Sequence, residues 1–149
     1  MNTQPAQTKA HTSEAAKSSA AAAQWLSHAP FYDHLGLQVV SIGDGSASLL
    51  LSPSTDLGNS KGDLHGGAIA SMMDITLSQA VRSAYPSGIN VSTISMTVNY
   101  LAPSQGNALS HAQVIRAGHS IAYAEGDVKN EAGDIVCRVS GSYRIIRPK

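Results

Sequence analysis

The chain has 149 residues, which suits a single domain with a core large enough to fold alone. Ten basic and ten acidic residues give a formal net charge of zero, so the composition excludes the polybasic footprint of a nucleic-acid-binding protein. No apolar run approaches the roughly 18 residues that a membrane span needs, so neither a membrane partner nor a secretory signal is expected.

The first part of the chain is divided between a tail and the start of the domain. Ala, Ser, Thr and Gln are frequent in residues 1–24, which predicts a flexible or partly helical tail, and the domain proper is expected over residues 25–149. A helical turn ended by glycine is predicted over residues 31–36. Two strands joined by a tight Gly-Asp-Gly turn are predicted over residues 37–42 and 47–51. A loop is predicted over residues 52–64.

A long helix is predicted over residues 66–84, because apolar residues recur there at helical spacing and small or apolar residues also occupy its other sides. Four strands are predicted after it, over residues 91–100, 107–117, 120–130 and 135–146. Alternation in the first of these strands predicts two faces, one carrying Ile94, Met96, Val98 and Tyr100 and the other Thr93, Ser95, Thr97 and Asn99. Short connections favour antiparallel neighbours. The order therefore predicts an α+β fold in which a curved antiparallel β-sheet wraps around one long helix.

The start of the long helix carries the tripeptide His65-Gly66-Gly67. The first N–H groups of a helix have no partner within the helix, and the helix dipole adds positive potential there. Glycine lets a ligand approach the backbone, so a carbonyl oxygen that gains negative charge would be stabilised at this point. The alternative is that the two glycines only allow close packing of the helix start.

Asp74 lies in the middle of this apolar helix, where a carboxylate is costly unless it is paired or functional. It is either a solvent-facing or hydrogen-bonded structural residue, a general base for water, or a nucleophile towards an acyl carbonyl. Gly66 and Asp74 are eight residues apart, which is about 12 Å along a helix and too far for both to act on one carbonyl. If both act in one site, Gly66 of one chain and Asp74 of another must meet across a twofold axis, so the sequence predicts at least a homodimer.

Several motifs together carry a resemblance to a known family. They are Asn59, the run Gly62-Asp63-Leu64-His65-Gly66-Gly67 with Asp74, and the later runs Asn99-Tyr100-Leu101-Ala102-Pro103, Arg116-Ala117-Gly118-His119-Ser120 and Glu131-Ala132-Gly133-Asp134-Ile135-Val136. Over residues 31–147 the sequence resembles the hotdog-fold acyl-CoA thioesterases of the phenylacetic-acid-degradation type, within the 4-hydroxybenzoyl-CoA thioesterase superfamily. The resemblance implies a hotdog fold, a homodimer that pairs into a homotetramer, and hydrolysis of acyl-CoA to free acid and CoA. Separately, the lone Cys137 favours a cytoplasmic, reducing setting.

The resemblance also implies roles for individual residues. Asp74 corresponds to the base or nucleophile, Gly66 to the oxyanion donor with Gly67 in support, and His65 to the residue that shapes the carbonyl site. Asn59 corresponds to the side chain that holds the attacking water, and Thr93 to a hydroxyl near that water. The expected substrate-binding residues are Gly67, Met73, Arg116, Gly118 and Arg138, the arginines being candidates for the CoA phosphates.

No metal and no cofactor are expected, because the histidines do not stand at metal-ligand spacing with carboxylates or cysteine, and Cys137 is expected to pack in the sheet. One alternative function is a non-catalytic acyl-CoA-binding or regulatory module on the same fold, which Asp74 argues against. Another is a hydratase or dehydratase, whose helix carries a different pattern of histidine and acid. The sequence leaves open the identity of the acyl group.

Overall fold

The computed structural model describes residues 29–149, so the tail expected over residues 1–24 lies outside the described residues. Two α-helices, one 3-10 helix and six strands make up this part of the chain. In chain order they are α2 (Pro30–Leu35), β1 (Leu37–Gly43), β2 (Ser46–Leu51), η1 (Thr55–Leu57), α3 (Gly66–Ser83), β3 (Asn90–Tyr100), β4 (Ala108–Ala117), β5 (Ile121–Lys129) and β6 (Ile135–Ile146). Each predicted strand and the long helix are confirmed to within one residue at either end.

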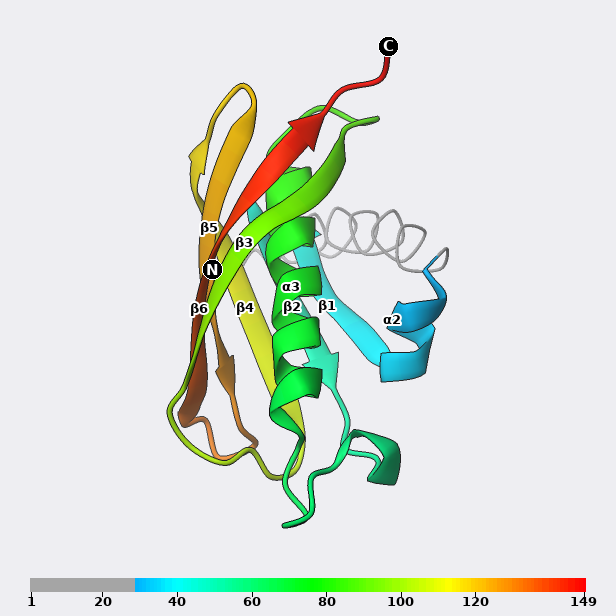
Figure 1. The fold of residues 1–149 in the computed structure, drawn as a ribbon, viewed down its shortest axis with the longest axis vertical. Helices are drawn as coiled ribbons and strands as arrows, with labels where there is room; N and C mark the ends of the chain where they lie inside the picture. Colours follow the sequence, from blue (N-terminus) through cyan, green and yellow to red (C-terminus); the bar gives the residue numbers. More distant parts are fainter. Residues whose placement is uncertain (1–28) are drawn as a thin grey trace, which may run out of the picture.

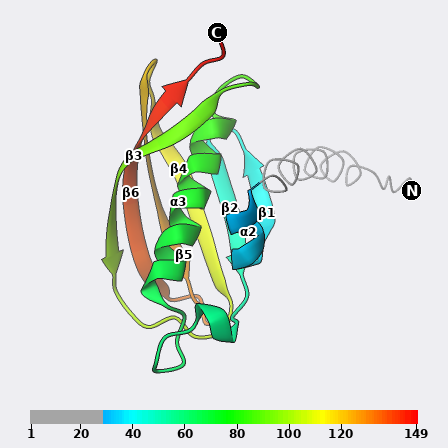
Figure 2. The same ribbon diagram turned by 45° about the vertical axis from the view of Figure 1, so that its right-hand side comes forward.

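One curved, fully antiparallel sheet wraps around α3, which confirms the predicted hotdog architecture (Figure 1). The strand order is β1-β2-β4-β5-β6-β3, so β1 and β3 form the two edges of the sheet. In Figure 2 the helix lies against the concave face, with α2 beside β1. Strand β3 reaches its edge position because the chain crosses from α3 to the far side of the sheet and pairs with β6, the last strand.

The helix fits into the sheet because large and small residues are divided between them. Met72, Met73 and Leu77 of α3 are completely buried. The inner face of the central strands offers mainly small residues opposite them: Ala112, Ala122, Ala124 and Gly126. A Cβ atom at Gly126 would lie 2.8 Å from the terminal methyl carbon of Met73, so only glycine leaves room for that side chain. Met73, expected to contact substrate, is therefore a core residue in this protomer.

Two of the predicted turns need backbone conformations that glycine adopts most easily. The β1–β2 hairpin turns through Asp44 (φ 50°) and Gly45 (φ 77°), and two positive φ angles in succession match the twist of an antiparallel hairpin. Helix α2 ends at Gly36, which has φ 68° and donates to the carbonyl groups of Tyr32 and Asp33. Local turn chemistry thus sets these boundaries.

The predicted faces of β3 are wrong at the start of the strand. Thr93 pairs with Tyr143 and Ser95 pairs with Ser142, so Ile94 is an extra residue in a β-bulge. The bulge turns Thr93 towards the helix, onto the same face as Met96, Val98 and Tyr100, and leaves Ile94 54% exposed. Simple alternation had placed Thr93 on the opposite face from these residues.

Candidate active site

The start of α3 is organised by the side chain of His65. His65 is the residue before the first helical turn, and its Nδ1 atom accepts a hydrogen bond of 2.8 Å from the N–H of Gly67. The N–H groups of Ala68 and Ile69 bind the carbonyl oxygen of His65. The N–H of Gly66 is left with no acceptor among the described residues. Sequence reasoning offered both glycines as donors, whereas only Gly66 has a free N–H group.

The capping bond also fixes the tautomer of the neutral His65 ring. Because Nδ1 accepts from Gly67, the ring proton must be on Nε2, and the exposed ring offers an N–H donor of its own at the start of α3. A Cβ atom at Gly67 would lie 3.0 Å from Nδ1, so the second glycine keeps this capping bond free of steric pressure.

Tyr100, at the end of β3, holds the first turn of α3 in place. Its hydroxyl donates a 2.7 Å hydrogen bond to the carbonyl oxygen of Gly66, and its ring lies against the same residue. A Cβ atom at Gly66 would lie 3.3 Å from two atoms of that ring. Gly66 therefore has a packing function in addition to its free N–H group. Burial raises the pKa of the Tyr100 phenol, which favours the donor form of its hydroxyl.

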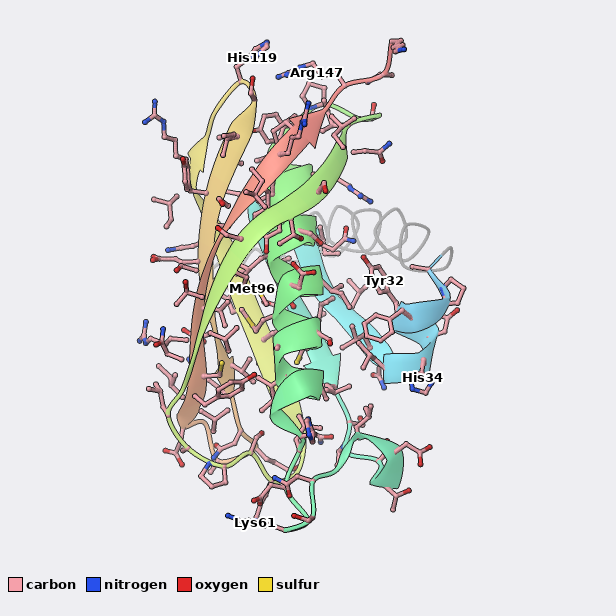
Figure 3. The ribbon with its side chains drawn as sticks, in the orientation of Figure 1. Tyr32, His34, Lys61, Met96, His119 and Arg147 are labelled. Carbon is pink, nitrogen blue, oxygen red and sulfur yellow. The ribbon has the colours of Figure 1, made fainter. Side chains whose placement is uncertain are left out.

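A groove of about 280 Å³ opens beside Gly66, and its lining includes Asn59, Lys61, Ile69 and Tyr100. Lys61 supplies a cation there, at the end of the molecule where α3 begins (Figure 3). The side-chain oxygen of Asn59 accepts from the N–H groups of Lys61 (2.9 Å) and Asp63 (3.1 Å) and so holds the loop before the helix. Its amide nitrogen has no partner within residues 29–149 and remains available in the groove.

Asp74 lies on α3, half-buried, where β3 and β6 both reach it. Thr93 Oγ1 donates a 2.7 Å hydrogen bond to Asp74 Oδ1, and Tyr143 Oη donates to the same oxygen over 3.3 Å. Burial, with the charge and hydrogen bond of the Asp74 carboxylate, raises the pKa of Tyr143 far above its usual range. The tyrosine therefore stays protonated and donates to Asp74. Sequence reasoning predicted Thr93 but missed Tyr143.

The groups around Gly66 and around Asp74 are contacted by different parts of strand β3. Tyr100 contacts Gly66, whereas Thr93, seven positions earlier on β3, contacts Asp74. Gly66 and Asp74 are about 12 Å apart along α3 at the rise of an α-helix. Within one protomer, the oxyanion donor and the carboxylate therefore form two separate half-sites.

The remaining candidates for substrate binding lie away from the helix. Arg138 is on the outer face of the sheet, in a pocket that also contains the acids Glu125 and Asp127. Gly118 belongs to the β4–β5 turn, where its N–H bonds to Ile121 and its carbonyl oxygen accepts from Tyr85. This turn is next to His119, at the opposite end of the molecule from Lys61 in Figure 3. Arg116 is exposed on β4.

The described residues contain no group of three or more histidine, cysteine or acidic side chains that could hold a metal ion. Within the same part of the chain no helix is long and apolar enough to cross a membrane. Cys137 is completely buried, and burial raises the pKa of its thiol to about 11, so it is suited to packing and not to attack on a substrate.

A family model described as the thioesterase superfamily matches residues 61–137, which include Gly66, Asp74 and Thr93. The chain belongs to the thioesterase superfamily. A protein of Halobacterium salinarum that is provisionally named an esterase is 35% identical over 124 residues, which cover 76% of this chain and 82% of that relative. Membership of this superfamily supports hydrolase chemistry.

Several solved structures share the fold. A conserved protein of Pseudomonas aeruginosa has a TM-score of 0.78 at 28% identity, over 83% of this chain and 99% of that one. The PaaI protein of the Escherichia coli phenylacetic acid degradation operon has a TM-score of 0.79 at 20% identity, over 89% and 95%. A hypothetical thioesterase of Streptococcus pneumoniae, solved with coenzyme A, has a TM-score of 0.69 at 18% identity, over 76% and 88%.

Proposed function

We propose that this protein hydrolyses an acyl-CoA thioester to the free acid and CoA. Superfamily membership supports hydrolysis, and the coenzyme A in the Streptococcus pneumoniae structure supports a CoA-type ligand. The observation that carries the proposal is the pair of half-sites, a free backbone N–H at a helix start and a carboxylate with one uncommitted oxygen. Acyl transfer to water needs both groups.

In the proposed reaction, the thioester carbonyl oxygen accepts a hydrogen bond from the N–H of Gly66, which stabilises the negative charge of the tetrahedral intermediate. Asp74 removes a proton from water as its oxygen attacks the carbonyl carbon. The carbon–sulfur bond then breaks, and the CoA thiolate takes the proton from Asp74. The products are the carboxylic acid and the CoA thiol.

Thr93 favours the role of Asp74 as a base over its role as a nucleophile. The Thr93 hydroxyl donates its one proton to Asp74 Oδ1, so its lone pairs can only accept. A water molecule between Thr93 and Asp74 would donate one proton to each, which holds it for attack. The amide nitrogen of Asn59 is a donor in the other half-site, where it can assist the carbonyl oxygen.

The two half-sites complete each other in a homodimer. Strand β3 is an edge of the sheet, and its exposed residues include the apolar Ile94 and Tyr100, which a partner strand would cover. In an antiparallel pairing of two β3 strands, the Tyr100 end of one strand meets the Thr93 end of the other. Gly66 of one chain then approaches Asp74 of the second chain, which gives two equivalent sites per dimer. Dimers that pair again would give the tetramer that the resemblance implies.

The function is tested with a panel of aryl, short, medium and hydroxylated acyl-CoA substrates and detection of the released thiol. The wild type is expected to turn over part of the panel, and Asp74→Asn to reduce turnover by at least about a hundredfold, as expected for loss of a general base. Asn is close in shape to Asp and accepts the same hydrogen bonds from Thr93, so the fold is expected to remain. Binding of CoA by calorimetry without release of thiol would instead identify a non-catalytic binding module.

A further inference from the structure

Tyr143 is completely buried, yet its hydroxyl is directed to the only carboxylate of α3. It lies on β6, and no sequence motif of the superfamily resemblance includes it. Thr93 lies directly opposite Tyr143 on the paired strand β3, so two donors from neighbouring strands of one protomer converge on one acceptor. Both hydrogen bonds end on Asp74 Oδ1, at 2.7 Å from Thr93 and 3.3 Å from Tyr143.

We propose that Tyr143 is a positioning residue for the hydrolytic reaction, which anchors Asp74 Oδ1 and leaves Oδ2 to take the proton from water. This inference rests on the proposed function. Two donors on one oxygen fix the rotation of the carboxylate about its Cβ–Cγ bond. The second oxygen, Oδ2, has no hydrogen-bond partner among residues 29–149. A carboxylate held in one orientation is a better base than one that rotates, because the reacting geometry is already set.

The surrounding structure keeps the Tyr143 ring in this position. Gly141 is two residues earlier on the same face of β6. A Cβ atom there would lie 2.9 Å from Tyr143 Cε2 and 3.1 Å from its hydroxyl oxygen. The absence of a side chain at Gly141 is therefore what allows the ring to lie along the strand and reach the helix. A side chain there would press on the Tyr143 ring and, at 3.1 Å, on the backbone oxygen of Ser95, without removing a polar atom.

The alternative is a structural role alone, in which Asp74 only accepts the hydrogen bond that the buried Tyr143 hydroxyl needs. On that reading, loss of the hydroxyl lowers stability but leaves the chemical step unchanged. The positioning reading makes a different prediction, because the effect must pass through Asp74. It must change kcat more than KM, and it must vanish when Asp74 can no longer act as a base.

The first variant is Tyr143→Phe, with Tyr123→Phe as the matched control, since Tyr123 is on the outer face of the sheet, 46% exposed. We expect Tyr143→Phe to lower kcat about tenfold with KM within about twofold, the scale of one hydrogen bond to a charged group. The control is expected to match the wild type in both measurements.

The second variant, Gly141→Ala, keeps every polar atom and is expected to reproduce the loss in kcat. The third is Tyr143→Phe combined with Asp74→Asn, which is expected to have the residual rate of Asp74→Asn alone. Circular dichroism verifies folding before each assay.

The outcomes separate the two levels of the proposal. A wild type that hydrolyses no acyl-CoA would overturn the proposed function and this inference with it. An active wild type, an inactive Asp74→Asn and an unchanged kcat in Tyr143→Phe would overturn only the positioning role. A wild-type kcat in folded Gly141→Ala, or a further loss in the double variant, would also overturn it.

Discussion

Replacement of Gly66 by proline removes the proposed oxyanion donor and leaves the helix intact. Gly66 is the first residue of α3, and its N–H makes no hydrogen bond among the described residues, so the helix loses none. His65 has φ −63° and ψ 136°, the extended conformation that a residue before proline requires. The matched control is Gly66→Ala, which adds the same Cβ against the Tyr100 ring, 3.3 Å away, but keeps the N–H group.

The magnitude follows from the number of donors. Loss of one oxyanion donor costs about a hundredfold to a thousandfold in kcat. Gly66→Ala is expected to lose only what the displaced Tyr100 ring costs, within about tenfold. The comparison of Gly66→Pro with Gly66→Ala therefore isolates the N–H group. The assay is steady-state thiol release on the best acyl-CoA of the panel, with helix content measured by circular dichroism. Equal kcat values for the two folded variants would refute the role of the Gly66 N–H.

Three further predictions test the assembly, the thiol and the buried phenol. Gly66→Pro and Asp74→Asn chains, each inactive alone, are mixed to form mixed dimers. About one quarter of wild-type activity is expected, because half of the dimers are mixed and each mixed dimer has one intact site. No recovery of activity would place both residues in one protomer. Cys137→Ala is expected to keep wild-type kcat/KM. Burial raises the pKa of the native Cys137 thiol to about 11, so this thiol is expected to react with alkylating agents only after unfolding. Rapid labelling of the native protein would contradict this. Burial raises the pKa of Tyr143 above its ordinary value of 10.0, so the unfolded state releases this proton first. The stabilisation that comes from the protonated Tyr143 is fully present below pH 10, and above it the free energy of unfolding falls by about 1.4 kcal/mol per pH unit. Between pH 9 and pH 11, measured by urea unfolding, Tyr143→Phe should therefore lose less free energy of unfolding than the wild type.

The fold was predictable because its determinants are periodic or local. The helix over residues 66–84 was recognised from apolar spacing and ends at Ser83 in the structure. The hairpin turn at Asp44 and Gly45 was predicted from composition, and both residues have positive φ angles. Such patterns need no knowledge of distant contacts. The same alternation, read along β6, could have placed Arg138 on the outer face, since its neighbours Cys137 and Val139 are both buried.

The candidate site was predictable only where it is encoded locally. The helix start at Gly66 carries its own signal, but the use of the Gly67 N–H by the His65 ring depends on a rotamer that composition does not reveal. Tyr143 is 69 positions from Asp74, so their contact exists only in the folded sheet. Its signal was an isolated phenol on a buried strand face, which needs a partner for its hydroxyl. Asp74 is the carboxylate that the helix offers there.

The bulge at Ile94 is the reason why simple alternation fails at Thr93, and it also bears on the proposed mechanism. Without the extra residue, Thr93 would face outward with Ser95, and Asp74 would lose its shorter hydrogen bond. With it, Thr93 faces the helix and Ile94 is exposed on the free edge of the sheet. One irregularity thus aims a donor at the carboxylate and places an apolar side chain where a partner strand would pair. On the proposed account, assembly of the dimer and completion of the active site depend on this same strand.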